Sequence, residues 1–81
     1  MRQLDNFSKE LITIEEFSEF VNHMRSSIGL TKREFADAMG VTKSTVINWE
    51  NAATIPNNVH AIIRTMRIVV KLRIRNSRLI A

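Results

Sequence analysis

The chain has 81 residues, of which 44% are hydrophobic and 25% charged, a composition typical of one compact globular domain. It contains no cysteine, which excludes a disulfide framework and thiolate chemistry. Acidic residues recur through the first twenty positions and no apolar run reaches the roughly 20 residues that a membrane helix requires, so we expect a soluble, cytoplasmic protein without a signal peptide.

Charge is distributed unevenly along the chain. Residues 1–40 carry five Lys or Arg against seven Asp or Glu, whereas residues 41–81 carry seven against one. The net charge is +4 and the isoelectric point is near 10.4. A basic half indicates binding to a polyanion such as nucleic acid, although a basic solvated surface would have the same composition. Motifs have to distinguish between these two interpretations.

The first predicted helix begins at a capping box. Residues 1–12 show no clear apolar period and are interpreted as an N-terminal arm. Thr13 is followed three residues later by Glu16, a spacing that lets both side chains accept hydrogen bonds from free N–H groups at a helix start. Gly29 supplies a left-handed stop. The residues predicted to form the inward face of this helix are Phe17, Phe20, Val21, Met24 and Ile28.

Two shorter helices are predicted next. Thr31 and Glu34 form a second capping box, and Gly40 ends that helix after about two turns. Thr42 is a further N-cap candidate, from which a third helix runs over residues 43–50. Two short helices joined by a tight turn that contains glycine form a helix-turn-helix arrangement. The residues predicted to face the core are Phe35, Ala36 and Met39 on one helix and Val46 and Trp49 on the other.

The C-terminal third is consistent with two structures. Residues 51–58 are predicted to be a loop, since Pro56 disfavours helical geometry at Ile55 and fits just before a helix that starts near Asn57 or Asn58. Beyond this loop the apolar residues fit a helical stripe, but some of them also alternate with basic residues as in a half-buried strand. No turn signal interrupts the segment, so we expect one long helix, with a β-strand as the alternative. The helical stripe is Ile62, Met66, Val69, Val70 and Ile74, and the alternating set is Ile68, Val70, Leu72 and Ile74.

Five short motifs follow one another between residues 30 and 56. They are a Phe-Ala pair, a Gly-Val turn, a Ser/Thr-rich helix start, an aromatic-Glu-Asn ending and a downstream proline, at Phe35-Ala36, Gly40-Val41, residues 42–45, Trp49-Glu50-Asn51 and Pro56. In this order and spacing the segment resembles the XRE family of helix-turn-helix proteins, which includes the phage lambda repressor and Cro-like proteins. The likeness covers about residues 17–63. Ala52, where the family commonly has glycine, and the arginine-rich C-terminus are departures from the family pattern.

The resemblance implies an all-α fold, a compact lambda-repressor-like domain of four to five helices over residues 13–64. Residues 65–81 would then be a basic C-terminal extension and a candidate dimerisation element. The implied function is a sequence-specific transcriptional regulator, expected to be a repressor that binds double-stranded DNA at a palindromic operator. It would bind as a homodimer through the recognition helix at residues 43–50. The protein is expected to be encoded by a bacterium, a phage or another mobile element.

The resemblance also assigns residues to DNA contacts. Lys43, Ser44, Ile47 and Asn48 stand where the family reads bases; Lys43 can donate to guanine, and Asn48 suits adenine. Ile47 lies about 100° around the helix from Val46, so we expect it to contact thymine methyl groups, with core packing as the alternative. Helix capping alone would also explain Thr31 and Thr42. The phosphate-contacting candidates are Arg25, Thr31, Lys32, Arg33, Thr42, Thr45 and Asn51.

One ion pair is expected from the resemblance. In the family an arginine late in the first helix often meets the glutamate that ends the recognition helix, and the matching residues are Arg25 and Glu50. We predict a partly buried bridge that orients Arg25 towards the DNA backbone. Removal of one partner alone would cost a few kcal/mol, about 3–5 for a fully buried pair.

Other functions have less support. The serines lack a partnering base, and His23 and His60 have no neighbours at metal-ligand spacing, so we expect no enzyme, no cofactor and no metal site. The main alternative is an antitoxin or a phage or mobile-element interaction protein that binds another protein. A third is a DNA-processing accessory or architectural protein that uses the basic tail. The dimerisation candidates, which could equally contact a protein partner, are Ile68, Val70, Leu72 and Ile74.

Overall fold

A computed structural model describes residues 12–80, with side chains described through residue 75. Within that range it contains helices and no strand. The elements are α2 (Ile14–Ser27), α3 (Lys32–Met39), α4 (Lys43–Glu50) and α5 (Val59–Ile80). The all-α fold is therefore confirmed, and the β-strand alternative for the C-terminal segment is wrong. The predicted arm at residues 1–12 lies outside the described residues except for Ile12.

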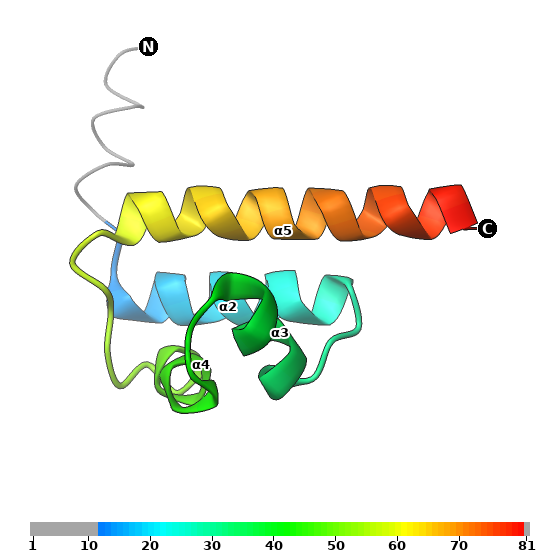
Figure 1. Cartoon of the computed structure of the whole chain (residues 1–81). Coiled ribbons are helices and arrows are strands. Elements are labelled where there is room, and N and C mark those ends of the chain that lie inside the picture. Colours follow the sequence, from blue (N-terminus) through cyan, green and yellow to red (C-terminus); the bar gives the residue numbers. More distant parts are fainter. Residues whose placement is uncertain (1–11, 81) are drawn as a thin grey trace, which may run out of the picture.

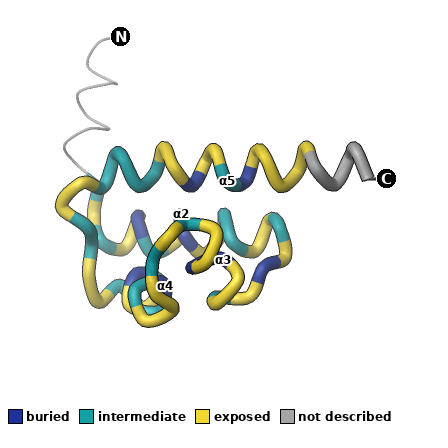
Figure 2. Tube along the Cα trace, viewed as in Figure 1, coloured by how far each residue is buried: buried dark blue, intermediate teal, exposed yellow. Residues whose placement is uncertain are grey.

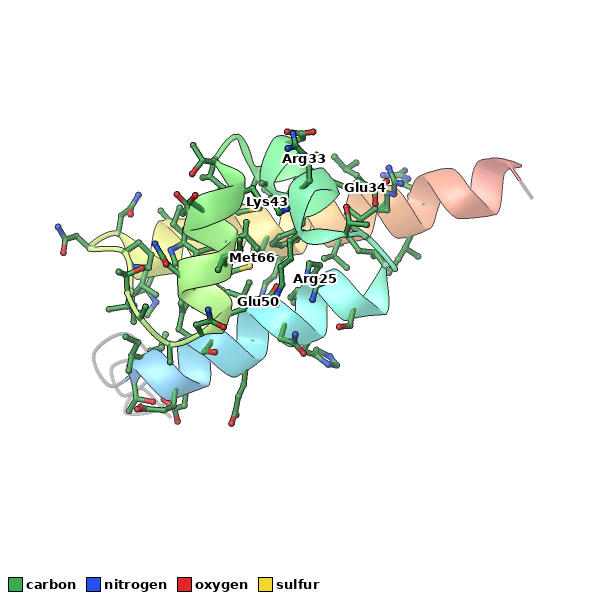
Figure 3. The ribbon with its side chains drawn as sticks, turned by 90° about the horizontal axis from the view of Figure 1, so that it is seen from below. Arg25, Arg33, Glu34, Lys43, Glu50 and Met66 are labelled. Carbon is green, nitrogen blue, oxygen red and sulfur yellow. The ribbon has the colours of Figure 1, made fainter. Side chains whose placement is uncertain are left out.

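The helices form a small domain from which one end of α5 projects. Figure 1 shows α5 running alongside α2 in the same direction, with α4 on the opposite side of the domain from α5. The C-terminal end of α5 extends past the other helices in this view and in Figure 3. Among the described helices, none has the length and apolar character needed to cross a membrane.

Both predicted capping boxes are present. The hydroxyl of Thr13 accepts a hydrogen bond from the N–H of Glu16 at 3.0 Å, and the Glu16 carboxylate accepts one from the N–H of Thr13 at 2.9 Å. Thr31 and Glu34 make the same reciprocal pair at 3.1 and 2.9 Å. These bonds satisfy N–H groups that have no partner inside the helix, which is why the predicted starts of α2 and α3 were correct.

Helices α2, α3 and α4 end in the same way. Each is followed by a residue with positive φ: Gly29 (66°), Gly40 (75°) and Ala52 (58°). After α4 the N–H of Ala53 donates back to the carbonyl of Asn48 at 2.9 Å, which is the six-residue bond of a Schellman motif. The position where the chain departs from the family glycine thus keeps the left-handed backbone that glycine favours, at a steric cost for the Ala52 side chain.

The core lies where α2, α3, α4 and α5 meet (Figure 2). Phe17 of α2 and Trp49 of α4 pack edge to face, with ring centroids 5.5 Å apart and planes at 79°. Met66 of α5 is 0% exposed, so α5 contributes to the core beyond residue 64, where the predicted domain boundary falls, and the helix runs through that position without a break. Seven residues predicted to face inward belong to the buried cluster: Phe17, Val21, Phe35, Ala36, Val46, Trp49 and Met66. Ile74, which was predicted for the inward stripe of the C-terminal helix, is 47% exposed, so that part of the prediction is wrong.

The set of dimerisation candidates needs a correction. Val70 is only 9% exposed and belongs to the buried side of α5, whereas Ile68, Leu72 and Ile74 are 54%, 50% and 47% exposed. The four residues were grouped by a period of two, but in a helix successive residues are about 100° apart, so alternate residues do not share a face. Ile68 and Leu72 lie one turn apart on one side, and Ile74 lies about 160° around the helix from Leu72.

Candidate nucleic-acid interface

The predicted base-reading residues share one side of α4. Lys43, Ser44 and Asn48 are exposed and Ile47 is half-buried, whereas Val46 and Trp49 are buried. At about 100° per residue, the four candidates span about 140° of the helix circumference, away from the buried pair. Figure 3 looks at the domain from the α4 side. The short helix therefore presents an outward face that consists of one cation, two small polar groups and one aliphatic side chain.

The N-terminus of this helix is capped by threonine. The Thr42 hydroxyl accepts a hydrogen bond from the N–H of Thr45 at 3.1 Å, and the two hydroxyl oxygens lie 2.9 Å apart. Thr42 thus has the capping role expected of it. At the start of α3 the Thr31 hydroxyl is occupied in the same way by the N–H of Glu34. A phosphate contact by either threonine would have to be made in addition to its cap.

The remaining phosphate candidates differ in their exposure and in the contacts that they already make within the protein. Arg33 is exposed and points away from the domain in Figure 3. Lys32 is half-buried, and its ammonium lies 4.0 Å from a carboxylate oxygen of Glu50. Asn51 is exposed and caps the C-terminus of α4. Arg33 is consequently the cation of α3 that a phosphate group reaches most easily.

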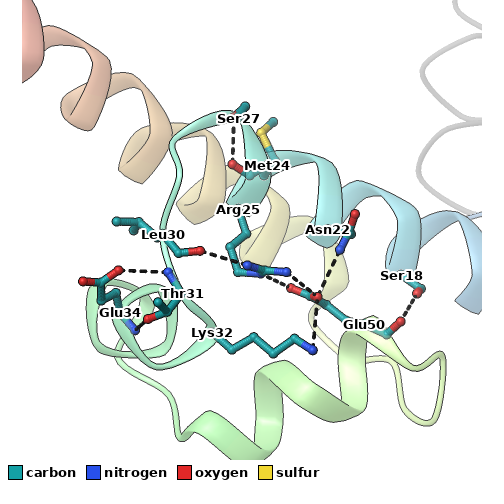
Figure 4. Close-up of polar contacts among 10 residues, drawn as sticks. All are labelled: Ser18, Asn22, Met24, Arg25, Ser27, Leu30, Thr31, Lys32, Glu34 and Glu50. Atoms are coloured by element: carbon teal, nitrogen blue, oxygen red, sulfur yellow. Dashed lines mark hydrogen bonds and ion pairs between the residues drawn. The ribbon is translucent and has the colours of Figure 1, made fainter.

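The structure brings Arg25 and Glu50 together (Figure 4). Arg25 Nε lies 2.6 Å from Glu50 Oε2, and Nη2 lies 3.1 Å from Oε1, which makes a two-point contact between guanidinium and carboxylate. Arg25 Nη1 also donates to the carbonyl of Leu30 at 2.9 Å. The side chains are 18% and 5% exposed, respectively. One guanidinium therefore joins α2, the loop that leads to α3, and the last residue of α4.

Two further residues of α2 hold the same end of α4, and our sequence reasoning missed both. Asn22 Nδ2 donates to Glu50 Oε1 at 3.2 Å, and Ser18 Oγ donates to the backbone carbonyl of Glu50 at 2.7 Å. A signal was available, because Ser18, Asn22 and Arg25 have the i, i+4, i+7 spacing of one helix face. It pointed to a polar stripe on α2, but nothing in the spacing named the partner.

Both members of the ion pair stay charged at neutral pH. Burial works to raise the pKa of Glu50, but the hydrogen bonds from Arg25 and Asn22, with the charges of Arg25 and Lys32, hold this pKa below its ordinary value of 4.5. The hydrogen bond to Glu50 raises the pKa of Arg25 against the opposing effect of burial. The carboxylate is thus a fixed negative charge at the C-terminal end of α4.

The part of the chain that the structure describes shows neither a metal-binding cluster nor an unpaired buried polar group. No group of three or more His, Asp or Glu side chains there is placed to hold a metal ion. No buried side-chain nitrogen or oxygen in that part lacks a hydrogen-bond partner. The buried residues of that part are all hydrophobic.

Comparison with known families gives one match. Residues 23–62 match the family model described as "Helix-turn-helix", a range that runs from the second half of α2 through α3 and α4 into the first turn of α5. Comparison of the chain with curated proteins and with solved structures gave no match. The matched family consists of DNA-binding regulatory domains and is typically non-enzymatic. Through residues 23–62, the chain belongs to the XRE family of helix-turn-helix DNA-binding regulators.

Proposed function

We propose that the protein is a sequence-specific transcriptional repressor that inserts α4 into the major groove of its operator. The observation that carries the proposal is the outward face of α4, where Lys43, Ser44, Ile47 and Asn48 lie together while Val46 anchors the opposite side. A helix of this kind fits the major groove, whose base edges have a distinct donor and acceptor pattern for each base pair.

Each side chain on this face has a matching base. Lys43 donates to guanine O6 or N7, and Asn48 both donates to and accepts from adenine. Ile47 contacts a thymine methyl group; it is half-buried, so part of its side chain is held against the protein and the rest is presented outwards. Ser44 can donate or accept, so it adds little discrimination of its own.

Backbone phosphates on either side of the groove would be bound by residues that flank α4. Arg33 is exposed, and Lys32 would share its charge between Glu50 and a phosphate. Thr31, Thr42, Thr45 and Asn51 would contribute hydroxyl, amide and backbone donors. Three of the five N–H donors of Arg25 are already used inside the protein, so its main role is to hold Glu50, with a phosphate contact as a minor addition.

The protein would bind as a homodimer through α5. Ile68 and Leu72 lie one turn apart on one side of this helix and are 54% and 50% exposed, so a second copy packed on that side would remove them from water. Two recognition helices about 34 Å apart, one turn of DNA, would then read a palindrome. Such a dimer would repress by occupying a site that overlaps a promoter.

The proposal is tested by selecting duplexes from a randomised 20-base-pair library and measuring their affinity at several salt concentrations. A recovered palindrome is expected, and Ile47→Ala and Asn48→Ala should each weaken binding to it by about tenfold or more, with little change for random duplexes. Lys71→Ala on α5 is the matched surface control and should retain the preference. Recovery of no consensus, together with steeply salt-dependent binding to all duplexes, would contradict sequence-specific regulation.

The proposed dimer has its own measurement. Sedimentation equilibrium of the protein with and without the selected duplex should give a dimer that Leu72→Ser weakens, whereas Thr65→Ser on the same helix should leave it intact. A monomer at every concentration that binds half of the palindrome would contradict the dimer but leave base reading by α4 standing.

A further inference from the structure

The orientation of α4 is not set by α4 alone. The helix has eight residues, about two turns, and its buried side chains are Val46 and Trp49. Two anchors less than one turn apart leave a short helix free to roll and tilt unless its ends are held. Because Ile47 and Asn48 lie within one turn of the C-terminus, a small roll of α4 would move the side chains that are proposed to read bases.

The C-terminus of α4 is held at two different atoms of Glu50. Ser18 Oγ binds the backbone carbonyl at 2.7 Å, and Asn22 Nδ2 binds the carboxylate at 3.2 Å (Figure 4). The last carbonyls of a helix have no partner within it, so the Ser18 bond satisfies a group that would otherwise need water. Since this bond reaches the main chain, it restrains the helix itself and does not depend on the conformation of the Glu50 side chain.

These contacts form a polar clamp on α2, which we define as Ser18, Asn22 and Arg25. Arg25 supplies the charge and is partly buried, and Ser18 lies two turns earlier on the same face of α2. Contacts spread along about 10 Å of α2 resist rotation of α4 better than one ion pair does, because a single pair can act as a pivot.

We infer that Ser18 and Asn22 are positioning residues that determine DNA specificity from outside the recognition helix, by fixing the roll of α4. The inference rests on the proposed base reading by α4. Neither residue needs to touch DNA. Loss of either should therefore blur the discrimination between the correct and incorrect bases while leaving the phosphate contacts, and so the non-specific affinity, unchanged.

The test measures the ratio of the dissociation constants for random and selected duplexes, using the sequence that the parent protein recovers from a randomised 20-base-pair library. Ser18→Ala should lower this ratio about three- to tenfold, the equivalent of one net hydrogen bond, and Asn22→Ala about two- to threefold. Ser18→Thr retains the hydroxyl and should restore the ratio. Ser26→Ala is the matched control, because it removes the same hydroxyl from an exposed position on the same helix.

Thermal unfolding and salt dependence separate positioning from simple loss of stability. Ser18→Ala is expected to remain fully folded at the assay temperature and to keep the parental slope of affinity against salt. An unchanged ratio in Ser18→Ala would overturn the inference, as would equal weakening on both duplexes or failure of Ser18→Thr to restore the ratio. If the parent protein itself recovers no preferred sequence, the proposed function fails instead, so the two failures are distinguishable.

Discussion

Helix α4 has eight residues and depends on other elements at both of its ends, whereas α5 has 22 residues and extends beyond the helices that it packs against. At the N-terminus of α4 stands the Thr42 cap, and at its C-terminus Glu50 is held by side chains of α2. Glu50 takes part in the ion pairs with Arg25 and with Lys32. Met66 and Val70 fix the inner side of α5 by apolar packing instead.

This difference between α4 and α5 follows from the lengths of the two helices and from their proposed roles. A helix of two turns is not stable by itself in water, so α4 exists only because the rest of the domain holds it, and the same contacts set its direction. A long helix closes most of its hydrogen bonds internally and can project from the domain with exposed apolar side chains. The contacts that fix a helix in one orientation are thus found at α4, whereas the exposed apolar side chains are found on α5.

The largest predicted change in the free energy of unfolding distinguishes the inner side of α5 from its outer side. Met66→Ala removes a fully buried side chain and should lower the free energy of unfolding by about 3 kcal/mol. Leu72→Ala, at a position that is 50% exposed, should change it by less than about 0.5 kcal/mol at concentrations where the protein is monomeric. Urea unfolding of the two variants makes the comparison. Equal losses would mean that the outer side is also packed.

The next largest change in the free energy of unfolding concerns the ion pair that holds the C-terminus of α4. Glu50→Gln keeps the shape of the side chain but leaves the guanidinium of Arg25 without its counter-charge. We expect a loss of about 2 kcal/mol, less than for a fully buried pair because Arg25 is 18% exposed. Lys32→Met is the control, since that ammonium is 4.0 Å away and 39% exposed, and should cost under about 1 kcal/mol. If the unfolding curves of both variants match that of the parent, the ion pair does not stabilise the fold that holds α4.

Acidification should loosen α4 without a mutation. The pKa of Glu50 is lowered in the folded protein, so its contribution to stability is complete above the ordinary value of 4.5 and is lost as the pH falls through the lower folded value. The free energy of unfolding of the parent should therefore fall towards that of Glu50→Gln as the pH drops below 4.5. Chemical unfolding at several pH values measures both proteins. A gap that stays constant down to pH 3 would contradict a charged Glu50 as its source.

The smallest effect lies at the end of α4. Ala52 has a φ of 58°, in the left-handed region that glycine adopts without strain. Ala52→Gly should therefore raise the free energy of unfolding by about 0.5–1 kcal/mol, since the relief of strain exceeds the added freedom of the unfolded chain. Ala53→Gly is the control, because Ala53 has no positive φ and its replacement should be neutral or destabilising. Thermal unfolding that ranks the two variants in the reverse order would contradict the strain.

The sequence by itself determined the local structure of this protein. The starts of α2, α3 and α4 and the ends of α2 and α3 follow from hydrogen bonds between residues three to five apart, so threonine caps and glycine stops located them before any packing was known. The buried faces followed from helical spacing. The family motifs added the Arg25–Glu50 pair, which the structure brings together, while the base-reading residues remain proposals.

Only the tertiary structure decided which distant groups meet. Ser18 and Glu50 are 32 positions apart, and their contact depends on how α2 crosses α4, which no local pattern specifies. The same packing placed Val70 inside and left Ile68 and Leu72 outside, although the three alternate in sequence. The alternation at residues 68–74 fits a strand as well as a helix, and burial of Met66 and Val70, one helical turn apart, against the core accounts for the helix. Local hydrogen bonds are encoded within a few residues, whereas helix crossings are set by the fit of whole faces.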